Sequence, residues 1–297
     1  MQEAPLLAVP RARLTGAFIG RLEAFVRRQA GRAERGPLAG RGSARGAGDE
    51  FAGYRPYRSG EDARHLDWAL YARLEQPFVR VHRREAGERW LVLLDTSGSM
   101  GLGAPGKLQL AAEVALALAA SGQRVGASTE LLALRADGSL LRRTFARRQD
   151  LPDWIAALES LESTPNGARG LRELLPHCVQ RRRRDARLFA LGDFLDLEPG
   201  ILRSLERRGQ VVELAQVLAP HEIAPGALGL GAARWADRES GAQLGAALEG
   251  KALAHYAAAL ERREESWRRA ARRHGMAWSA WSSATPFEDV AAALLGA

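Results

Sequence analysis

Residues 91–100 constrain the fold more than any other segment, because a short apolar run ends there in the pattern Asp-x-Ser-x-Ser. An amphipathic segment follows at residues 107–120. The order strand, polar loop, helix is that of one βα unit. Open α/β sheets place their binding sites at the carboxyl ends of strands. The pattern therefore predicts a functional loop at residues 95–99.

The loop contains Asp95, Ser97 and Ser99, and several chemical interpretations compete for it. A nucleophilic-serine elbow has the pattern Gly-x-Ser-x-Gly, and this loop does not have it. Aspartyl-phosphate chemistry needs a second Asp where Ser97 stands. A polar turn that caps a helix stays open, since Ser and Asp are favoured N-caps. A carboxylate with two hydroxyls also offers the hard oxygen ligands that suit Mg²⁺.

From residue 90 onward, buried strands alternate with helices. The apolar runs that predict strands are residues 91–94, 129–134, 140–145, 188–191 and 211–218. Asp137-Gly138 lies between two of these runs and is a strong hairpin signal. Such alternation predicts an α/β protein with a doubly wound, mostly parallel sheet that is covered on both faces.

Helical patterns flank this region on both sides. Residues 12–34 read as an amphipathic helix, and Tyr256, Leu260, Trp267 and Ala271 share one face of a long helix. Residues 276–281 can form an edge strand. Thr285-Pro286-Phe287-Glu288 has the form of a capping box with Pro at the first helical position, which predicts a last helix starting near Pro286.

Composition narrows the class of protein. The chain is 46% hydrophobic and 26% charged, which is typical of a globular protein. No apolar run approaches the roughly 20 residues of a spanning helix, and no signal-peptide pattern opens the chain. The single cysteine, Cys178, excludes an internal disulfide. These features predict a cytoplasmic protein without a membrane span.

The net charge of +8 does not by itself indicate nucleic-acid binding. Lys107 and Lys251 are the chain's two lysines; its other basic residues are arginines spread along the sequence. No basic patch interleaved with aromatic residues is present, so no nucleic-acid partner is expected. The six histidines and the carboxylates show no zinc spacing, and none of the histidines is a convincing general base.

Two later positions supply oxygens that the fold can bring near Asp95. Thr164 lies in a loop between two helical segments, and Asp193 ends the strand 188–192. If that strand is a neighbour of strand 91–94, both carboxylates face one crevice. Taken alone, Thr164 is more often a cap and Asp193 a turn residue.

This arrangement resembles the von Willebrand factor A domain and its metal-ion-dependent adhesion site. The resemblance covers roughly residues 88–220 and implies one Mg²⁺ or Mn²⁺ ion held by Asp95, Ser97, Ser99, Thr164 and Asp193. Ser163 is an alternative to Thr164. The third loop of that family often reads Thr-Asp-Gly, whereas this chain has Gly192-Asp193-Phe194.

Residues 51–73 resemble the signature of a bacterial domain-of-unknown-function (DUF) family, number fifty-eight, upstream of an A-type domain. The matching residues are Tyr57, Gly60, Asp62, Arg64, Asp67, Trp68 and Arg73. Their charged members can form a paired network around Trp68 that fixes the segment structurally, or the segment can contact a partner. The resemblance implies an extension at 1–87, a von Willebrand factor A-like (Rossmann-like) domain at 88–220, and a C-terminal extension at 221–297 that packs on the same fold.

The family resemblance implies a binding protein and not an enzyme. Family members are commonly encoded beside MoxR-type AAA+ ATPases, which implies a metal-dependent adaptor or chaperone-like partner of such an ATPase or of its client protein. An acidic side chain of the partner would complete the coordination of the ion. A metal-dependent hydrolase that uses the same ion is the alternative, and a purely structural fold with an empty site is a third possibility.

Overall fold

The computed structural model describes residues 11–33, 50–56, 70–71, 76–83, 88–163, 170–179, 187–206, 210–228, 231–238 and 241–296. The chain divides into two compact units. One comprises Met1–Arg32 with Glu88–Ala297, and the other is Ala33–Gly87. The larger unit holds the main sheet and the candidate site.

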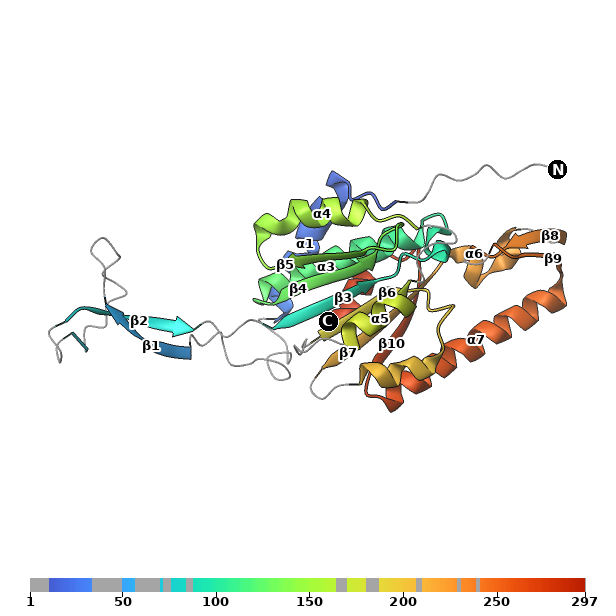
Figure 1. Ribbon diagram of the computed structural model, residues 1–297. Helices are drawn as coiled ribbons and strands as arrows, with labels where there is room; N and C mark the ends of the chain where they lie inside the picture. The colour runs from blue at the N-terminus through green and yellow to red at the C-terminus, as the bar shows by residue number, and fades with distance from the viewer. Residues whose placement is uncertain are drawn as a thin grey trace. The chain divides into compact units, whose positions relative to one another are not determined.

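The larger unit is built on a six-stranded sheet in the order β10-β7-β6-β3-β4-β5 (Figure 1). Every neighbouring pair is parallel except β4 and β5, which form an antiparallel hairpin. The strands are β3 (Arg89–Leu94), β4 (Ser128–Leu134), β5 (Leu140–Phe145), β6 (Arg187–Gly192), β7 (Val211–Leu218) and β10 (Ala277–Ser282). The topology confirms the predicted α/β class with a mostly parallel sheet, and it is consistent with a von Willebrand factor A-like fold.

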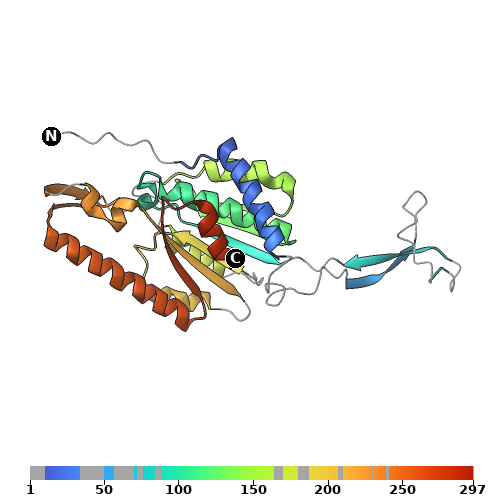
Figure 2. The same ribbon diagram turned by 180° about the vertical axis from the view of Figure 1, so that it is seen from behind.

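Helices cover both faces of the sheet, so two apolar cores lie on its opposite sides. One core takes residues from α1 (Gly16–Ala33), α3 (Lys107–Arg124), α4 (Leu151–Glu159) and α8 (Phe287–Leu295). The other takes residues from α5 (Leu171–Val179), the 3₁₀ helix η5 (Pro199–Leu205) and α7 (Gly250–Arg273). Figure 2 shows α1 and α8 lying on one face, and Figure 1 shows α5 over the other.

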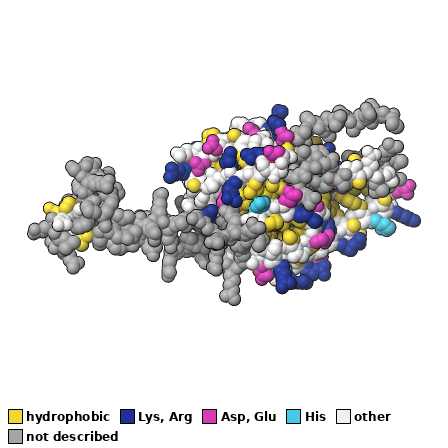
Figure 3. All heavy atoms as spheres, viewed as in Figure 1, with side chains coloured by type: hydrophobic (Ala, Val, Ile, Leu, Met, Phe, Trp, Pro, Cys, Tyr) yellow, Lys and Arg dark blue, Asp and Glu magenta, His cyan; other side chains and the backbone are white. Residues whose placement is uncertain are grey.

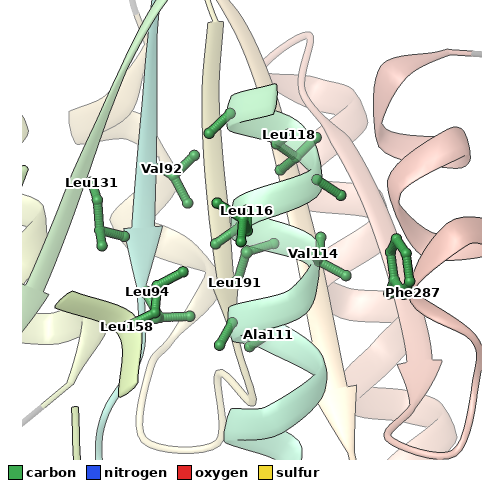
Figure 4. Packing of buried hydrophobic residues seen from close by; sticks show 14 of the residues in the cluster. Val92, Leu94, Ala111, Val114, Leu116, Leu118, Leu131, Leu158, Leu191 and Phe287 are labelled. Carbon is green, nitrogen blue, oxygen red and sulfur yellow. The ribbon is translucent and has the colours of Figure 1, made fainter. Parts of the chain in front are cut away.

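The central strand and its helix explain why this sheet forms. Alternate residues of β3 enter opposite cores: Leu91 and Leu93 face one, and Val92 and Leu94 face the other. Such a strand must be covered on both sides. Helix α3 is buried along most of its length, and Figure 4 shows its apolar side chains between the sheet and Phe287 of α8.

The neighbours β3 and β6 mark the point where the strand order reverses. After β3 the chain continues to β4, which lies next to β3 on the side away from β6. After β6 it continues to β7, which lies next to β6 on the side away from β3. Such a switch point opens a crevice at the carboxyl ends of the two strands, where open α/β sheets bind ligands. Asp95 follows β3 and Asp193 follows β6, so the predicted neighbourhood of these two strands is confirmed.

Smaller elements complete the described chain. They are two antiparallel hairpins, β1 (Glu50–Pro56) with β2 (Phe78–Arg83) and β8 (Gly231–Ala236) with β9 (Gln243–Leu248), the short helix α6 (Pro220–Ile223), and the 3₁₀ turns η3 (Gly98–Gly101), η4 (Arg148–Asp150) and η6 (Pro225–Leu228). Each helix in the described part of the chain is too short or too polar to cross a bilayer. Basic and acidic side chains are interspersed over the face shown in Figure 3.

One local prediction needs correction. The last helix starts at Phe287 with Pro286 at its N-cap, and no side chain caps it. The predicted capping box fails because the Glu288 carboxylate binds the Arg21 guanidinium of α1, with an Nε–Oε1 distance of 2.8 Å.

Candidate metal-ion site

The loop after β3 arranges one carboxylate and two hydroxyls within a few residues. The Asp95 backbone N–H donates to the Leu191 carbonyl of β6 at 2.9 Å, which joins the two strand ends. Asp95 Oδ1 accepts the Ser97 N–H at 2.9 Å, and the Oγ atoms of Ser97 and Ser99 are 3.2 Å apart. Asp95 and Ser97 are buried, whereas Ser99 is partly exposed.

These side chains do not cap the helix that follows. The N-cap of α3 is Gly106, and Ser97 is the N-cap of η3 but makes no side-chain capping bond. The interpretation of the loop as a helix cap is therefore wrong. Between the candidate ligands, Thr96 points its hydroxyl away and donates to the Leu134 carbonyl at 2.8 Å. Thr96 thus holds the neighbouring strand, whereas the hydroxyls of Ser97 and Ser99 lie 3.2 Å from each other beside Asp95.

The carboxylate of Asp95 is costly to ionise in this position. Burial raises the pKa of Asp95 to about 7, and the negative charge of Asp193 acts in the same direction. Hydrogen bonds from Ser97 lower this pKa but do not compensate. A buried anion beside a second anion favours a cation between or against them.

Asp193 accepts hydrogen bonds from three donors. Its Oδ2 accepts the Lys107 ammonium at 2.9 Å, and its Oδ1 accepts the Leu195 N–H at 3.0 Å. Its backbone carbonyl accepts the side-chain amide of Gln216 at 2.8 Å. The carboxylate is therefore fixed in place at the end of β6.

Lys107 is enclosed between two carboxylates. Its side chain is 0% exposed, and its Nζ lies 2.9 Å from Asp193 Oδ2 and 2.8 Å from Glu222 Oε1. Burial by itself lowers the pKa of Lys107, but the charges and hydrogen bonds of Asp193 and Glu222 outweigh burial and hold the pKa above its ordinary value. The ammonium is charged at neutral pH.

Two glycines let the backbone approach Asp95 closely. A Cβ at Gly170, where φ is +54°, would collide with Asp95 Oδ1. A Cβ at Gly192 would lie 2.6 Å from Asp95 Oδ2. Both positions therefore require glycine for the Asp95 carboxylate to keep its place, because no real Cβ tolerates such contacts.

Phe194 is strained directly after Asp193. It adopts φ 56°, a left-handed conformation that is an outlier for a bulky residue. Its ring packs edge-on against Trp267 and Trp278, with centroids 5.3 and 5.1 Å away. Arg263 of α7 donates to the Phe194 carbonyl at 2.9 Å. Strain that the surroundings hold in place is characteristic of functional sites.

The donor set fits a hard divalent ion. The described ranges contain no group of three or more His, Cys, Asp or Glu side chains that could hold a metal. The set here has two carboxylates and several hydroxyls, which are ligands that Mg²⁺ accepts together with water. Ser163, the alternative ligand of the second loop, has a buried hydroxyl whose Oγ has no hydrogen-bond partner among the described residues. Such a hydroxyl is consistent with a ligand role, but Ser121 and Thr129 also have buried hydroxyls without a partner there.

Residues 53–266 match the family described as Protein of unknown function DUF58. The chain belongs to this family. Among curated proteins, Uncharacterized protein Rv1480 of Mycobacterium tuberculosis and Uncharacterized protein Mb1516 of Mycobacterium bovis are each 32% identical over 187 residues, which is 60% of this chain and 57% of theirs. The chain therefore spans little more than half the length of these relatives.

Two solved structures align with this DUF58 chain at low identity. The conserved hypothetical protein BatB of Bacteroides thetaiotaomicron is 13% identical with a TM-score of 0.45. An aerotolerance-related membrane protein of Bacteroides fragilis, which carries multiple mutations to serine, is 14% identical with a TM-score of 0.47. Each alignment covers 71% of this chain and 98% of the other.

Part of the sequence prediction for this DUF58 chain lies outside the described residues. This applies to Thr164 and to the signature residues Tyr57, Gly60, Asp62, Arg64, Asp67, Trp68 and Arg73. Of the predicted ligands, the structure brings together Asp95, Ser97, Ser99 and Asp193. Gly170, the first described residue after Ser163, lies against Asp95 and Ser97, because a Cβ there would meet Asp95 Oδ1 and Ser97 Cβ.

Sequence reasoning missed Lys107 and Glu222. Lys107 is one of two lysines in an arginine-rich chain and stands on the first turn of a helix that is buried along most of its length. The rarity of lysine in this chain was an available signal. Glu222 had none, because the short helix α6 reaches the site only through the tertiary fold.

Proposed function

We propose that this DUF58 protein binds a partner protein through a Mg²⁺ or Mn²⁺ ion held by Asp95, Ser97, Ser99, Asp193 and Thr164 or Ser163. The observation that carries the proposal is the placement of a carboxylate and two hydroxyls of one loop beside a second buried carboxylate at a topological switch point. Such an ion supplies an open coordination position that an acidic side chain can occupy.

The residues of this chain prepare that position. Asp95 and the hydroxyls of Ser97 and Ser99 offer oxygens to the ion, and the Asp95 carboxylate is anchored by the Ser97 N–H. Ser99 is the partly exposed member, so a partner's carboxylate would approach from its side. A bound divalent ion also removes the unfavourable burial of the Asp95 charge, because it is the largest local charge in such a site.

The proposed partner is a MoxR-type AAA+ ATPase or its client protein. Membership in the family supports this choice, since the resemblance in sequence implied such an adaptor role. We also propose that the chain acts in the cytoplasm and performs no hydrolysis. To occupy the open coordination position, the partner must present an exposed Asp or Glu.

A metal-dependent hydrolase is the second candidate, and the pKa of Asp95 gives it some support. A carboxyl group with a pKa of about 7 lies in the range of a general base. However, an Asp95 that ligates the ion is ionised and engaged, so it is not available to take a proton. Lys107 is committed to two carboxylates.

The experiment measures binding of a purified MoxR-type AAA+ ATPase from the same organism, with Mg²⁺ and with EDTA. We expect binding to fall at least tenfold with EDTA and in both Asp95→Ala and Asp193→Ala. Asp137→Ala, an exposed aspartate of the β4–β5 hairpin, is the matched control and should bind like wild type. Equal binding with and without EDTA contradicts the metal-bridged mechanism.

Two further measurements complete the test. Turnover of a phosphoester, ester or peptide that needs metal and is lost in Asp95→Ala would favour the hydrolase. Calorimetric titration of Ser163→Ala and Thr164→Ala with Mn²⁺ decides which hydroxyl of the second loop is the ligand, because only the loss of a true ligand should weaken binding.

A further inference from the structure

Lys107 is a buried cation that the proposed metal site does not need as a ligand. An ammonium group has three donors and no acceptor, so it cannot coordinate a metal ion. Its Nζ nevertheless lies 2.9 Å from Oδ2 of Asp193, a proposed ligand. The desolvation of a fully enclosed lysine is costly unless carboxylates compensate its charge, as Asp193 and Glu222 do.

Both oxygens of Asp193 already have partners within the protein. Oδ2 accepts from Lys107 and Oδ1 accepts from the Leu195 N–H. A divalent ion must therefore share these oxygens with fixed donors or bind Asp193 through water. Asp95 differs, because it accepts hydrogen bonds from the neutral groups of Ser97.

We propose that Lys107 is the built-in counter-cation of this site: it stabilises the fold without metal and weakens metal binding by competing for Asp193. This inference rests on the proposed metal site and concerns its regulation. Because Lys107 offsets part of the site's negative charge, a bound ion keeps more of its own positive charge. The ion therefore attracts an anionic partner group more strongly than it would beside two uncompensated carboxylates.

Glu222 determines how strongly Lys107 competes. Its Oε1 shares the ammonium at 2.8 Å, while its Oε2 accepts the Ala219 N–H at 2.7 Å. Tyr256 of α7 donates to the Glu222 backbone carbonyl at 2.6 Å, so the segment that carries this carboxylate is held in place. Removing the charge of Glu222 leaves Lys107 bound to Asp193 alone, which should strengthen the competition.

The test is calorimetric titration of the full chain with Mn²⁺ and with Mg²⁺. In Lys107→Met, a substitution of similar length without charge, we expect Mn²⁺ to bind about tenfold tighter than in wild type. The melting temperature without metal should fall, because Asp193 and Glu222 lose their shared cation, and saturating Mn²⁺ should restore most of the loss. Lys251→Met, at the other lysine and exposed on α7, is the control and should change neither quantity.

A second variant guards against misfolding of the first. Glu222→Gln keeps the side chain's shape and should weaken Mn²⁺ binding about threefold, in the direction opposite to Lys107→Met. If wild type binds Mn²⁺ and neither variant changes the affinity, the counter-cation role is wrong while the metal site stands. If Lys107→Met binds more weakly, the role is overturned as well. If neither wild type nor Lys107→Met binds Mn²⁺, the metal site itself is refuted and the inference falls with it.

Discussion

Two aspartates end neighbouring strands of one sheet and are equally buried, at 1% exposed each, but their charges are compensated differently. Asp193 receives an ammonium ion and a backbone N–H. Asp95 receives hydrogen bonds from Ser97, and among the described residues no Lys or Arg pairs with it. The difference indicates that Asp193 is stabilised within the fold, whereas the charge of Asp95 lacks such compensation; in the proposed site, a cation from solution would supply it.

The largest effect is expected on metal binding. Asp95→Ala should weaken Mn²⁺ binding at least about a hundredfold, since it removes the uncompensated carboxylate of the donor set. Titration calorimetry measures the affinity, and an unchanged circular-dichroism spectrum shows that the variant is folded. Mn²⁺ binding at wild-type affinity in Asp95→Ala would show that the ion is elsewhere or that no such site exists.

The second prediction concerns pH. Without metal, the contribution of Asp95 to the free energy of unfolding should fall by up to about 4 kcal/mol as the pH rises from about 4 to about 7. The sign follows because Asp95 in the folded protein keeps its proton up to a pKa of about 7, whereas the unfolded chain loses it near 3.8. The unfolded state therefore binds fewer protons in this window.

Denaturant unfolding at several pH values measures this slope. Asp95→Asn, which carries no titrating proton at this position, should remove the part of the slope that Asp95 contributes. Saturating Mg²⁺ should make the slope positive, because the ion binds the ionised carboxylate and its binding strengthens as the proton leaves. A wild-type slope equal to that of Asp95→Asn would show that Asp95 ionises normally.

The third prediction compares the two aspartates directly. Asp193→Asn should lower the free energy of unfolding by about 3 kcal/mol at pH 7, because Lys107 keeps its buried charge with one partner fewer. Asp95→Asn should be neutral or stabilising under the same conditions, since it removes an unfavourable charge. Metal-free protein and chemical denaturation are required. Equal losses in both variants would contradict the difference in compensation.

The smallest effect is expected at Thr96, which lies between the candidate ligands. Thr96→Val removes the hydrogen bond to the Leu134 carbonyl and should cost about 1 kcal/mol of stability. The Mn²⁺ affinity should stay at the wild-type value, because this hydroxyl points toward β4. A large loss of metal affinity in Thr96→Val would show that the ion lies on the side of the loop that faces β4, and this would contradict the proposed ligand set.

The fold could largely be predicted because its signals are local or periodic. The buried runs of β3 and β6, the amphipathic pattern of α3, and the Asp137-Gly138 turn each follow from a few consecutive residues. The resemblance of the motif then supplied Asp193, although nothing in the spacing of residues 95 and 193 reveals that their strands are neighbours.

The remaining features depend on tertiary contacts. Lys107 pairs with Glu222 across 115 positions of sequence, and Glu288 is taken by Arg21 instead of its own helix N-terminus. A local pattern cannot show which partner a charged side chain will meet. The predicted capping box is wrong for this reason, and the pairing of Lys107 with Asp193 and Glu222 could not be predicted for the same reason.

Phe194 has a consequence for how this site can evolve. The position demands a left-handed backbone, which glycine adopts freely and phenylalanine adopts only because Trp267 and Trp278 hold its ring. Substitutions at these three places are therefore not independent. A chain that loses either tryptophan should tolerate glycine at position 194 better than phenylalanine. The order in which such substitutions occur therefore decides which sequences can still adopt this fold.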